Sequence, residues 1–434
     1  MTQLNDLINE ISIESLTLDG RGVARLDGKV LFVDGALPGE RVRVSIQHRR
    51  RRHDEAILQT VLTPSPDRVE PRCPHFGVCG GCLLQHLAPA AQLAAKRQVL
   101  EDALEHIGRV TPRDWLEPVT GPVWGYREKA RLGVKWVVKK SRLLVGFRER
   151  RSSYLADLSR CETLHPAIGE QLGSLREVIE GLSIRDQIPQ VEVSRGDSGT
   201  VLAFRHLTSL TIDDRERLRV WGAASGFAIY LQGGGPASLR PLDEPLRLTY
   251  ALPAVGVTMA FEPGDFTQVN RVVNRAMVDL ALCQLNPQPG EAVLDLFCGL
   301  GNFTLPIAAR GGDVLGVEGD AGLVARAERN ARDNGLSARF VTADLQTVSG
   351  DEPWWRGNYH SALIDPPRSG ALAVLEPLAR TDIQRLVYFS CYPASLARDS
   401  QVLVHQLGFN LQAAGVLDMF PHTAHVESIA VFDR

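Results

Sequence analysis

The sequence predicts three structural parts: a small N-terminal β-barrel, a mainly β central region with clustered cysteines, and a C-terminal α/β domain built on a parallel sheet. Three observations support this division. Short apolar alternations separated by turn residues fill residues 1–66. Three cysteines gather within residues 73–82. After about Phe261 the pattern changes to strand, helix, strand, helix, which is typical of a parallel α/β sheet.

The overall composition indicates a soluble globular protein in a reducing compartment. A chain of 434 residues is long enough for two or three domains, and 44% hydrophobic with 23% charged residues is ordinary for such proteins. The net charge of -3 means that any nucleic-acid contact must come from local patches. No apolar run reaches a membrane span of about 18 residues, residues 1–16 lack a signal peptide's pattern, and the seven cysteines are an odd number. We therefore expect a cytoplasmic monomer that does not enter membranes.

The first 66 residues are expected to form the barrel. An Asp-Gly turn at residues 27–28 and a Pro-Gly pair at residues 38–39 separate short alternating segments. Arg49–Arg52 form a continuous basic run on one of the connections. The run is either a solvated surface loop or a set of phosphate contacts to RNA.

The central region, residues 67–262, begins with the motif Cys73-x5-Cys79-x2-Cys82. Glycines between these cysteines allow three thiolates to converge on one centre. Four-thiolate sites suit either zinc or an iron–sulfur cluster, and the spacing does not decide between them. The candidates for a fourth ligand are Cys161, then His75 and His86.

The C-terminal domain, residues 263–434, contains a cofactor-binding pattern. A buried strand at 291–297 leads into a glycine turn and a helix, and the next strand ends at Glu318, whose carboxylate can accept hydrogen bonds from both ribose hydroxyls of a nucleoside. A dinucleotide-binding turn for NAD is the alternative, but Thr304 replaces its third glycine. The pattern resembles the cofactor motif of class I (Rossmann-like) methyltransferases. Its residues, in order, are Asp295, Gly299, Gly301 and Glu318, and further acidic side chains follow later strands at Asp344 and Asp365.

A candidate nucleophile and a candidate base follow in the same domain. Asp365-Pro-Pro-Arg368 has arginine where an aromatic residue would indicate methylation of an amino group, and the strand 386–390 ends at Cys391. C5 of uracil is a poor nucleophile until a thiolate adds to C6, so this chemistry needs a cysteine. A base must then remove the C5 proton, and Glu427 is the candidate.

The elements D-P-P-R, S-C-x-P and L-D-x-F-P-H-T-x-H-x-E resemble the RNA 5-methyluridine methyltransferase family. The resemblance implies Cys391 as nucleophile and Glu427 as general base. Tyr392 and Ser395 stand where the family has Asn and Thr, which puts the hydrogen bonding around the nucleophile in doubt. The resemblance also implies contacts to S-adenosyl-L-methionine by Gln268, Phe297, Asn302, Glu318, Asp344 and Asp365.

The same resemblance extends to the other two parts. In several family members a similar cysteine arrangement holds a [4Fe-4S] cluster, which implies an iron–sulfur domain here with ligands Cys73, Cys79, Cys82 and Cys161. The barrel resembles a TRAM domain, an RNA-binding barrel of oligonucleotide-binding (OB) type. Together these parts resemble the branch that methylates uridine 1939 of 23S ribosomal RNA. In that branch the helix near residues 91–118 packs with the catalytic domain.

Three other functions compete with this interpretation. A tRNA 5-methyluridine enzyme would share Cys391 and Glu427, but in bacteria that branch looks free of the cluster and the barrel. A non-catalytic RNA-binding protein on a methyltransferase fold is disfavoured by the intact Cys391, Asp365 and Glu427. A dehydrogenase is disfavoured by Thr304.

Overall fold

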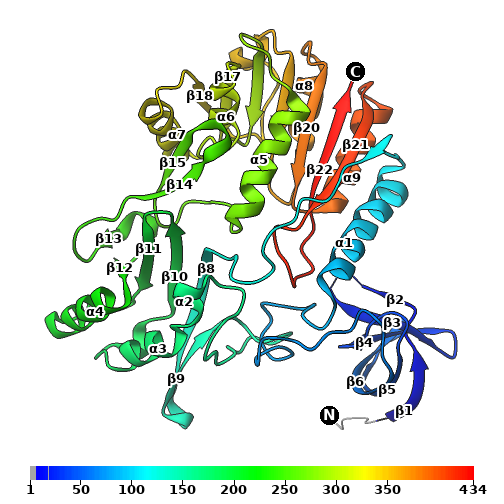
Figure 1. Ribbon diagram of the computed structural model, residues 1–434, viewed down its shortest axis with the longest axis vertical. Coiled ribbons are helices and arrows are strands. Elements are labelled where there is room, and N and C mark those ends of the chain that lie inside the picture. The colour runs from blue at the N-terminus through cyan, green and yellow to red at the C-terminus, as the bar shows by residue number, and fades with distance from the viewer. Residues whose placement is uncertain (1–5, 18) are drawn as a thin grey trace. The chain divides into compact units, whose positions relative to one another are not determined.

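The computed structural model describes residues 6–17 and 19–434 (Figure 1). The chain forms two compact units, each made of several segments. The smaller unit contains residues up to Val99 together with Phe147–Ala156 and Phe420–His425. The larger unit contains Leu100–Gly146, Asp157–Met419 and Val426–Arg434. Within residues 6–17 and 19–434, no helix combines the length and the apolar character that crossing a membrane requires.

The smaller unit contains a six-stranded sheet wrapped around an apolar core. The turn between β3 and β4 has positive φ at both Asp27 (49°) and Gly28 (81°), the conformation that a two-residue hairpin needs. Alternate residues such as Leu31, Val33, Val42 and Val44 are fully buried in the core. The strands, in sheet order, are β1 (Asp6–Ser12), β5 (Arg41–Arg49), β6 (His53–Thr63), β4 (Lys29–Asp34), β3 (Arg21–Leu26) and β2 (Ser15–Leu16).

The larger unit contains a second six-stranded sheet, in which residues 190–205 form an antiparallel hairpin. Its strands, in sheet order, are β13 (Leu239–Pro241), β12 (Phe227–Gln232), β11 (Gly199–Arg205), β10 (Gln190–Gly196), β8 (Lys129–Val137) and β9 (Arg142–Gly146). Three helices accompany this sheet: α2 (Pro166–Gly169), α3 (Leu172–Glu180) and α4 (Ile212–Ser225). Thr211 and Asp214 form a reciprocal capping box that begins α4.

The eight-stranded sheet of the larger unit is the α/β fold that the C-terminal rhythm predicted. Five neighbouring strands are parallel, so their carboxyl ends meet at one edge. β22 lies antiparallel between β20 and β21, which brings its first residue to that same edge. The order is β18 (Arg339–Thr342), β17 (Asp313–Glu318), β16 (Ala292–Leu296), β19 (Ser361–Ile364), β20 (Arg385–Ser390), β22 (Glu427–Asp433), β21 (Asn410–Leu417) and β7 (Asp114–Trp115).

Helices and a hairpin support this sheet. α5 packs on β19 and β20, α6 and α7 pack on β17, and α9 packs on β20 and β21. The hairpin β14–β15 docks on α7 through paired bonds between Asn330 and the main chain of Ala260, 2.9 and 3.0 Å long. These elements are α5 (Arg271–Leu285), α6 (Thr304–Ala309), α7 (Ala321–Asp333), α8 (Leu372–Ala379), α9 (Pro393–His405), β14 (Leu248–Leu252) and β15 (Val257–Phe261).

The long helix near residue 91 runs as α1 (Pro89–Ala103), and a π-helical turn then carries it to Gly108. Arg109 follows Gly108 in the left-handed conformation, which ends the helix. A Cβ at Gly108 would lie 2.9 Å from the carbonyl of Ala397 on α9, which indicates close packing there. β7 then pairs with β21 and becomes the edge strand of the eight-stranded sheet, while residues 104–108 pack on α9.

Candidate active site at the carboxyl edge of the eight-stranded sheet

The turn after β16 has the backbone of a nucleotide-binding loop. Phe297, Gly299 and Gly301 all have positive φ, between 55° and 89°, so the chain reverses sharply before α6. Glu318, at the end of β17, accepts a hydrogen bond from the Gly299 N–H at 3.1 Å. The acidic side chain and the glycine turn therefore lie together, as the sequence pattern predicted.

Asp295 lies beneath this turn and is completely buried. Its Oδ2 accepts a short hydrogen bond from the Thr304 hydroxyl, while its Oδ1 has no hydrogen-bond partner among the described residues. Burial, followed by the nearby Asp365 carboxyl, raises the pKa of Asp295 to about 7. The threonine that breaks the NAD glycine pattern is thus the hydrogen-bond donor to this buried carboxyl, a role that the sequence analysis missed.

Asn302 is fixed by two side chains that the sequence analysis also missed. Its Oδ1 accepts from the Tyr250 hydroxyl at 2.9 Å and from Asn274 Nδ2 at 3.1 Å. Its Nδ2 donates to Asn274 Oδ1 at 3.0 Å, which completes a reciprocal amide pair. Tyr250 and Asn274 are buried, and burial raises the pKa of Tyr250, so its hydroxyl stays protonated as a donor. The amide of Asn302 therefore has one defined orientation.

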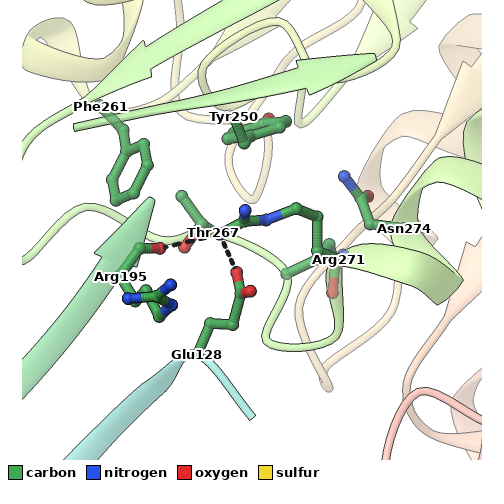
Figure 2. Close-up of a pocket in the computed structure, with 8 residues that line it drawn as sticks. Glu128, Arg195, Tyr250, Phe261, Thr267, Arg271 and Asn274 are labelled. Carbon is green, nitrogen blue, oxygen red and sulfur yellow. Dashed lines mark hydrogen bonds and ion pairs between the residues drawn. The ribbon is translucent and has the colours of Figure 1, made fainter. Parts of the chain in front are cut away.

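Tyr250 and Asn274 also line a small pocket (Figure 2). Arg271 occupies its middle, where it forms an ion pair with Glu128 and donates to the main-chain carbonyl of Arg195 at 3.5 Å. Gln268, a predicted cofactor contact, also lines this pocket. Its other walls come from Arg195, Phe261 and Thr267. The pocket is therefore charged on one side, aromatic on the other and continuous with the residues that hold Asn302.

The predicted nucleophile, base and acidic loop meet at the carboxyl edge. Cys391 follows β20, Asp365 follows β19, and Glu427 begins β22. Ser390 pairs with Ser428 in the β20–β22 register, and the Ser428 hydroxyl donates to the Ser390 carbonyl at 3.2 Å. Cys391 and Glu427 are consequently adjacent to paired residues of neighbouring strands.

Burial is the largest cause of the pKa shifts of Asp365, Glu427 and Cys391. Burial raises the pKa of Asp365 to about 7, and burial, then the Asp365 charge, raises the pKa of Glu427 well above its ordinary range. The pKa of the Cys391 thiol is raised by burial, then by Glu427 and Asp365. Arg368 acts in the opposite direction and lowers the pKa of both Cys391 and Glu427. The guanidinium of the D-P-P-R loop is thus the cation that favours the thiolate.

The remaining predicted cofactor residues lie around the same edge. Phe297 is the first positive-φ residue of the glycine turn and is partly exposed. Asp344 follows β18, is exposed, and accepts a hydrogen bond from the Gln346 N–H at 3.0 Å. Both lie after strands adjacent to the one that ends at Glu318.

His422 lies in the segment before Glu427, and its contacts within the smaller unit hold this segment in place. Its N–H donates to Gln92 Oε1 at 2.8 Å, and its carbonyl accepts from the N–H groups of Leu83 and Leu84 at 2.8 and 3.0 Å. Its ring Nδ1 also lies 3.1 Å from Gln92 Nε2. These bonds connect residues 420–425 to the segment that follows the cysteine motif.

The cysteine motif forms a loop in the smaller unit, where the Gly80 N–H donates to the Arg148 carbonyl at 2.9 Å and the Val78 carbonyl accepts from the Arg150 N–H at 2.8 Å. Cys73, Cys79 and Cys82 are each partly exposed, and the Gly81 N–H donates to the Cys79 sulfur at 3.4 Å. Cys161 belongs to the larger unit, where its sulfur lies 3.4 Å from the Thr163 hydroxyl. Across residues 6–17 and 19–434, no three or more His, Cys, Asp or Glu side chains are grouped as metal ligands.

The two histidines weighed as fourth ligands have different surroundings. His86 is buried and packs its ring on Phe76 at 5.3 Å, and burial, followed by Arg68, lowers its pKa to about 4. The carbonyl of His75 accepts the N–H of Cys79 at 2.9 Å. His86 is therefore a neutral ring beneath the cysteine loop, and His75 is part of the loop itself.

Comparisons with known proteins agree with this geometry. The family described as tRNA (Uracil-5-)-methyltransferase matches residues 251–434, and the TRAM domain family matches residues 8–53. Two relatives are named 23S rRNA (uracil(1939)-C(5))-methyltransferase RlmD. The one from Alkalilimnicola ehrlichii is 53% identical and covers 98% of this chain and 96% of its own. The one from Nitrosococcus oceani is also 53% identical, with 98% and 95% covered.

A solved structure has a similar fold over almost the whole chain. It is the Pyrococcus abyssi tRNA (uracil-54, C5)-methyltransferase in complex with S-adenosyl-L-homocysteine, with 25% identity and a TM-score of 0.75. It covers 98% of this chain and 99% of its own. The protein is thus an S-adenosyl-L-methionine-dependent methyltransferase with an N-terminal TRAM domain, and the chain belongs to the family of 23S rRNA (uracil-C5)-methyltransferases.

Proposed function

We propose that the protein transfers a methyl group from S-adenosyl-L-methionine to C5 of one uridine in 23S ribosomal RNA, the equivalent of position 1939, and that it acts as a cytoplasmic monomer. The observation that carries this proposal is the meeting of Cys391, Glu427, Asp365 and Arg368 at one sheet edge beside the cofactor turn. The 23S rRNA relatives, which match over nearly the full chain, support the choice of RNA.

In the proposed reaction the Cys391 thiolate adds to C6 of the uracil, and the resulting C5 enolate takes the methyl group from the sulfonium. Glu427 then accepts the C5 proton, and the thiolate leaves as the C5–C6 double bond re-forms. Burial raises the pKa of Glu427, so its ionised carboxylate is a stronger base than an exposed one. Burial raises the pKa of Cys391, and Arg368 offsets part of this rise, which favours the nucleophilic form.

We assign the cofactor contacts to Gln268, Phe297, Asn302, Glu318, Asp344 and Asp365. The hydrogen bond between Glu318 and the Gly299 N–H places a carboxylate at the glycine turn, where it suits ribose hydroxyls. The reciprocal bonds of Asn302 with Asn274 and Tyr250 give its amide a fixed direction at the same turn. A rigid contact of this kind reduces the ordering cost of binding.

We assign the cysteine motif to a [4Fe-4S] cluster held by Cys73, Cys79, Cys82 and Cys161, within an iron–sulfur domain at residues 67–262. Four thiols are the ligand set that such clusters take, and the Gly81 N–H bonded to the Cys79 sulfur is the kind of donor that stabilises a thiolate. When bound, the cluster supplies a rigid cross-link between the chain segments that carry its ligands. Anaerobically purified protein should contain about four irons per chain and be brown; one zinc and no visible absorbance would contradict this assignment.

We assign RNA backbone contacts to the barrel, proposed as a domain of residues 1–66. Arg49–Arg52 are all exposed at the connection between β5 and β6. The buried Asp54 anchors the base of this connection through Lys29 at 2.6 Å and Arg49 at 3.6 Å. The side chains of Arg50, Arg51 and Arg52 therefore project from a well-held turn, as phosphate contacts require.

A methyl-transfer assay with two RNAs tests the proposal. Purified enzyme is incubated with labelled S-adenosyl-L-methionine and either 23S rRNA or tRNA, each isolated from a strain that lacks this gene. We expect a single 5-methyluridine in 23S rRNA, mapped by sequencing, because the closely similar relatives are 23S rRNA enzymes. Preferential methylation of tRNA would support the activity named for the Pyrococcus abyssi structure instead.

A further inference from the structure

Asp399 on α9 is a completely buried carboxylate with a full set of donors. Its Oδ2 accepts from the Ala371 N–H at 2.7 Å and from the Tyr388 hydroxyl at 2.7 Å. Its Oδ1 accepts from two nitrogens of Arg398, at 2.8 and 2.7 Å. A buried carboxylate with this many bonds holds one geometry, because any displacement leaves a charge without compensation.

The Ala371 bond connects Asp399 to the loop that carries Asp365 and Arg368. Arg398 extends the same contact by donating to the Ser369 carbonyl at 2.8 Å. Gly370 lies between Ser369 and Ala371 and has φ of +82°. A Cβ added to it would lie 2.6 Å from Asp399 Oδ2. The residues that follow the D-P-P-R motif therefore pack directly against the Asp399 carboxylate.

The Tyr388 bond connects the same carboxylate to the strand that delivers the nucleophile. Tyr388 is completely buried on β20, three residues before Cys391. α9, which carries Asp399, begins at Pro393, two residues after Cys391. One side chain thus holds the chain on both sides of Cys391 and the loop of Arg368 in a common position.

We infer that Asp399 is a positioning residue for the methyl transfer: it sets the place of Arg368 relative to Cys391 and Glu427. This inference rests on the proposed function, in which Cys391 is the nucleophile. The charged and titratable groups that act on Cys391 are Glu427 from β22 and Asp365 and Arg368 from the loop after β19. Arg368 is the cation among them, so a displaced loop removes the influence that favours the thiolate.

The test measures the thiolate directly, without RNA. Cys391 is alkylated with iodoacetamide across a range of pH, and its modification is followed by peptide mass spectrometry so that the other cysteines do not interfere. Asp399→Asn keeps the size of the side chain but removes its charge. We expect the midpoint of Cys391 alkylation to move to higher pH, with about threefold to tenfold slower modification below the midpoint, and S-adenosyl-L-homocysteine affinity to stay within about twofold. Tyr388→Phe, which removes one of the four bonds, should give a smaller shift in the same direction.

Two controls separate positioning from stability. Asp214 is a similarly buried carboxylate, which accepts from the Ser183 N–H at 2.7 Å and from its hydroxyl at 2.6 Å, so Asp214→Asn should lower the melting temperature without moving the alkylation midpoint. Arg368→Gln should move the midpoint, and Asp399→Asn added to it should move it little further, because both changes act through one guanidinium.

Unchanged alkylation midpoints in Asp399→Asn and Tyr388→Phe would overturn the inference, as would fully additive shifts in the double variant. If Asp399→Asn does not fold, Tyr388→Phe decides alone. Failure of the proposed function is distinguishable, because it would appear as wild-type enzyme that does not methylate 23S rRNA, whereas the alkylation experiment uses no RNA.

Discussion

The carboxyl edge of the eight-stranded sheet and the cysteine loop at residues 73–82 both gather reactive side chains, but they are supported differently. At the sheet edge, Asp295, Glu318, Asp365 and Cys391 lie at the ends of hydrogen-bonded strands, so their positions follow from the register. In the cysteine loop, short-range bonds such as Cys79 N–H to the His75 carbonyl are combined with single main-chain bonds to a distant segment, such as Gly80 N–H to the Arg148 carbonyl at 2.9 Å, and no strand ladder fixes the cysteines within the described residues. The first arrangement is fixed by the sheet and suits ligands that bind and dissociate in each catalytic cycle. The second carries three of the four cysteines that we propose as cluster ligands, and a cluster held there would contribute to folding.

The largest effect is expected at the nucleophile. Cys391→Ala should reduce methyl transfer to 23S rRNA by at least about 10⁴-fold, because it removes the thiolate that adds to C6. Binding of S-adenosyl-L-homocysteine, measured by calorimetry, should be unchanged, since the sheet register that forms the cofactor turn is unaffected. Cys283→Ala, which changes an exposed cysteine, is the matched control and should be fully active. Turnover by Cys391→Ala within tenfold of wild type would contradict the covalent mechanism.

The next effect is expected at the base. Glu427→Gln should slow turnover by about 10² to 10⁴-fold, because the C5 proton is no longer removed after methylation. Enzyme joined to RNA through Cys391 should then accumulate and migrate slowly on a denaturing gel with labelled RNA. Substitution of a second buried carboxylate, Asp214→Asn, should give no such species. A Glu427→Gln enzyme that is inactive and forms no adduct would assign the base role to another group.

A third prediction separates the two regions. Cys82→Ser should reduce bound iron strongly and lower the melting temperature of the protein, because the cysteine loop is expected to depend on its bound group. Affinity for S-adenosyl-L-homocysteine should change by less than about threefold, because the carboxyl edge is held by its own sheet. Loss of cofactor binding in parallel with loss of iron would show that the two regions are not independent in this way.

The smallest effect concerns pH and the buried Asp295. Its pKa of about 7 is higher than that of an exposed aspartate, so in the folded protein it holds its proton longer than in the unfolded chain. The stabilisation associated with the protonated form is complete below the ordinary pKa near 3.8 and is lost as pH rises through about 7. Asp295→Asn removes this titration and should flatten the decline of the unfolding free energy between pH 4 and 7, by on the order of 2–4 kcal/mol. Identical pH profiles for the two proteins, in urea titrations without cofactor, would contradict the raised pKa.

Much of the candidate site could be predicted because of a simple geometric rule. Glu318, Asp344, Asp365 and Cys391 each follow a short apolar segment, and such segments alternate with helices. Parallel strands present their carboxyl ends at one edge, so side chains far apart in the chain converge there. The walls of the pocket in Figure 2 could not be predicted this way, because Arg195 lies in a different sheet, Glu128 directly precedes a strand of that sheet, and neither residue carries a local motif.

The sequence by itself determined the reactive residues of this protein and the strands that carry them. These are a cysteine at one strand end, acidic residues at the ends of neighbouring strands, and a glycine turn. Only the tertiary structure decided which groups orient that chemistry. Glu427 reaches Cys391 because β22 inserts antiparallel between β20 and β21, a register that no local pattern specifies. Asp399, Tyr250 and Asn274 act through hydrogen bonds to residues 28 to 52 positions away in the chain. The physical reason is that apolar periodicity specifies elements, whereas long-range packing specifies which polar side chains become buried partners.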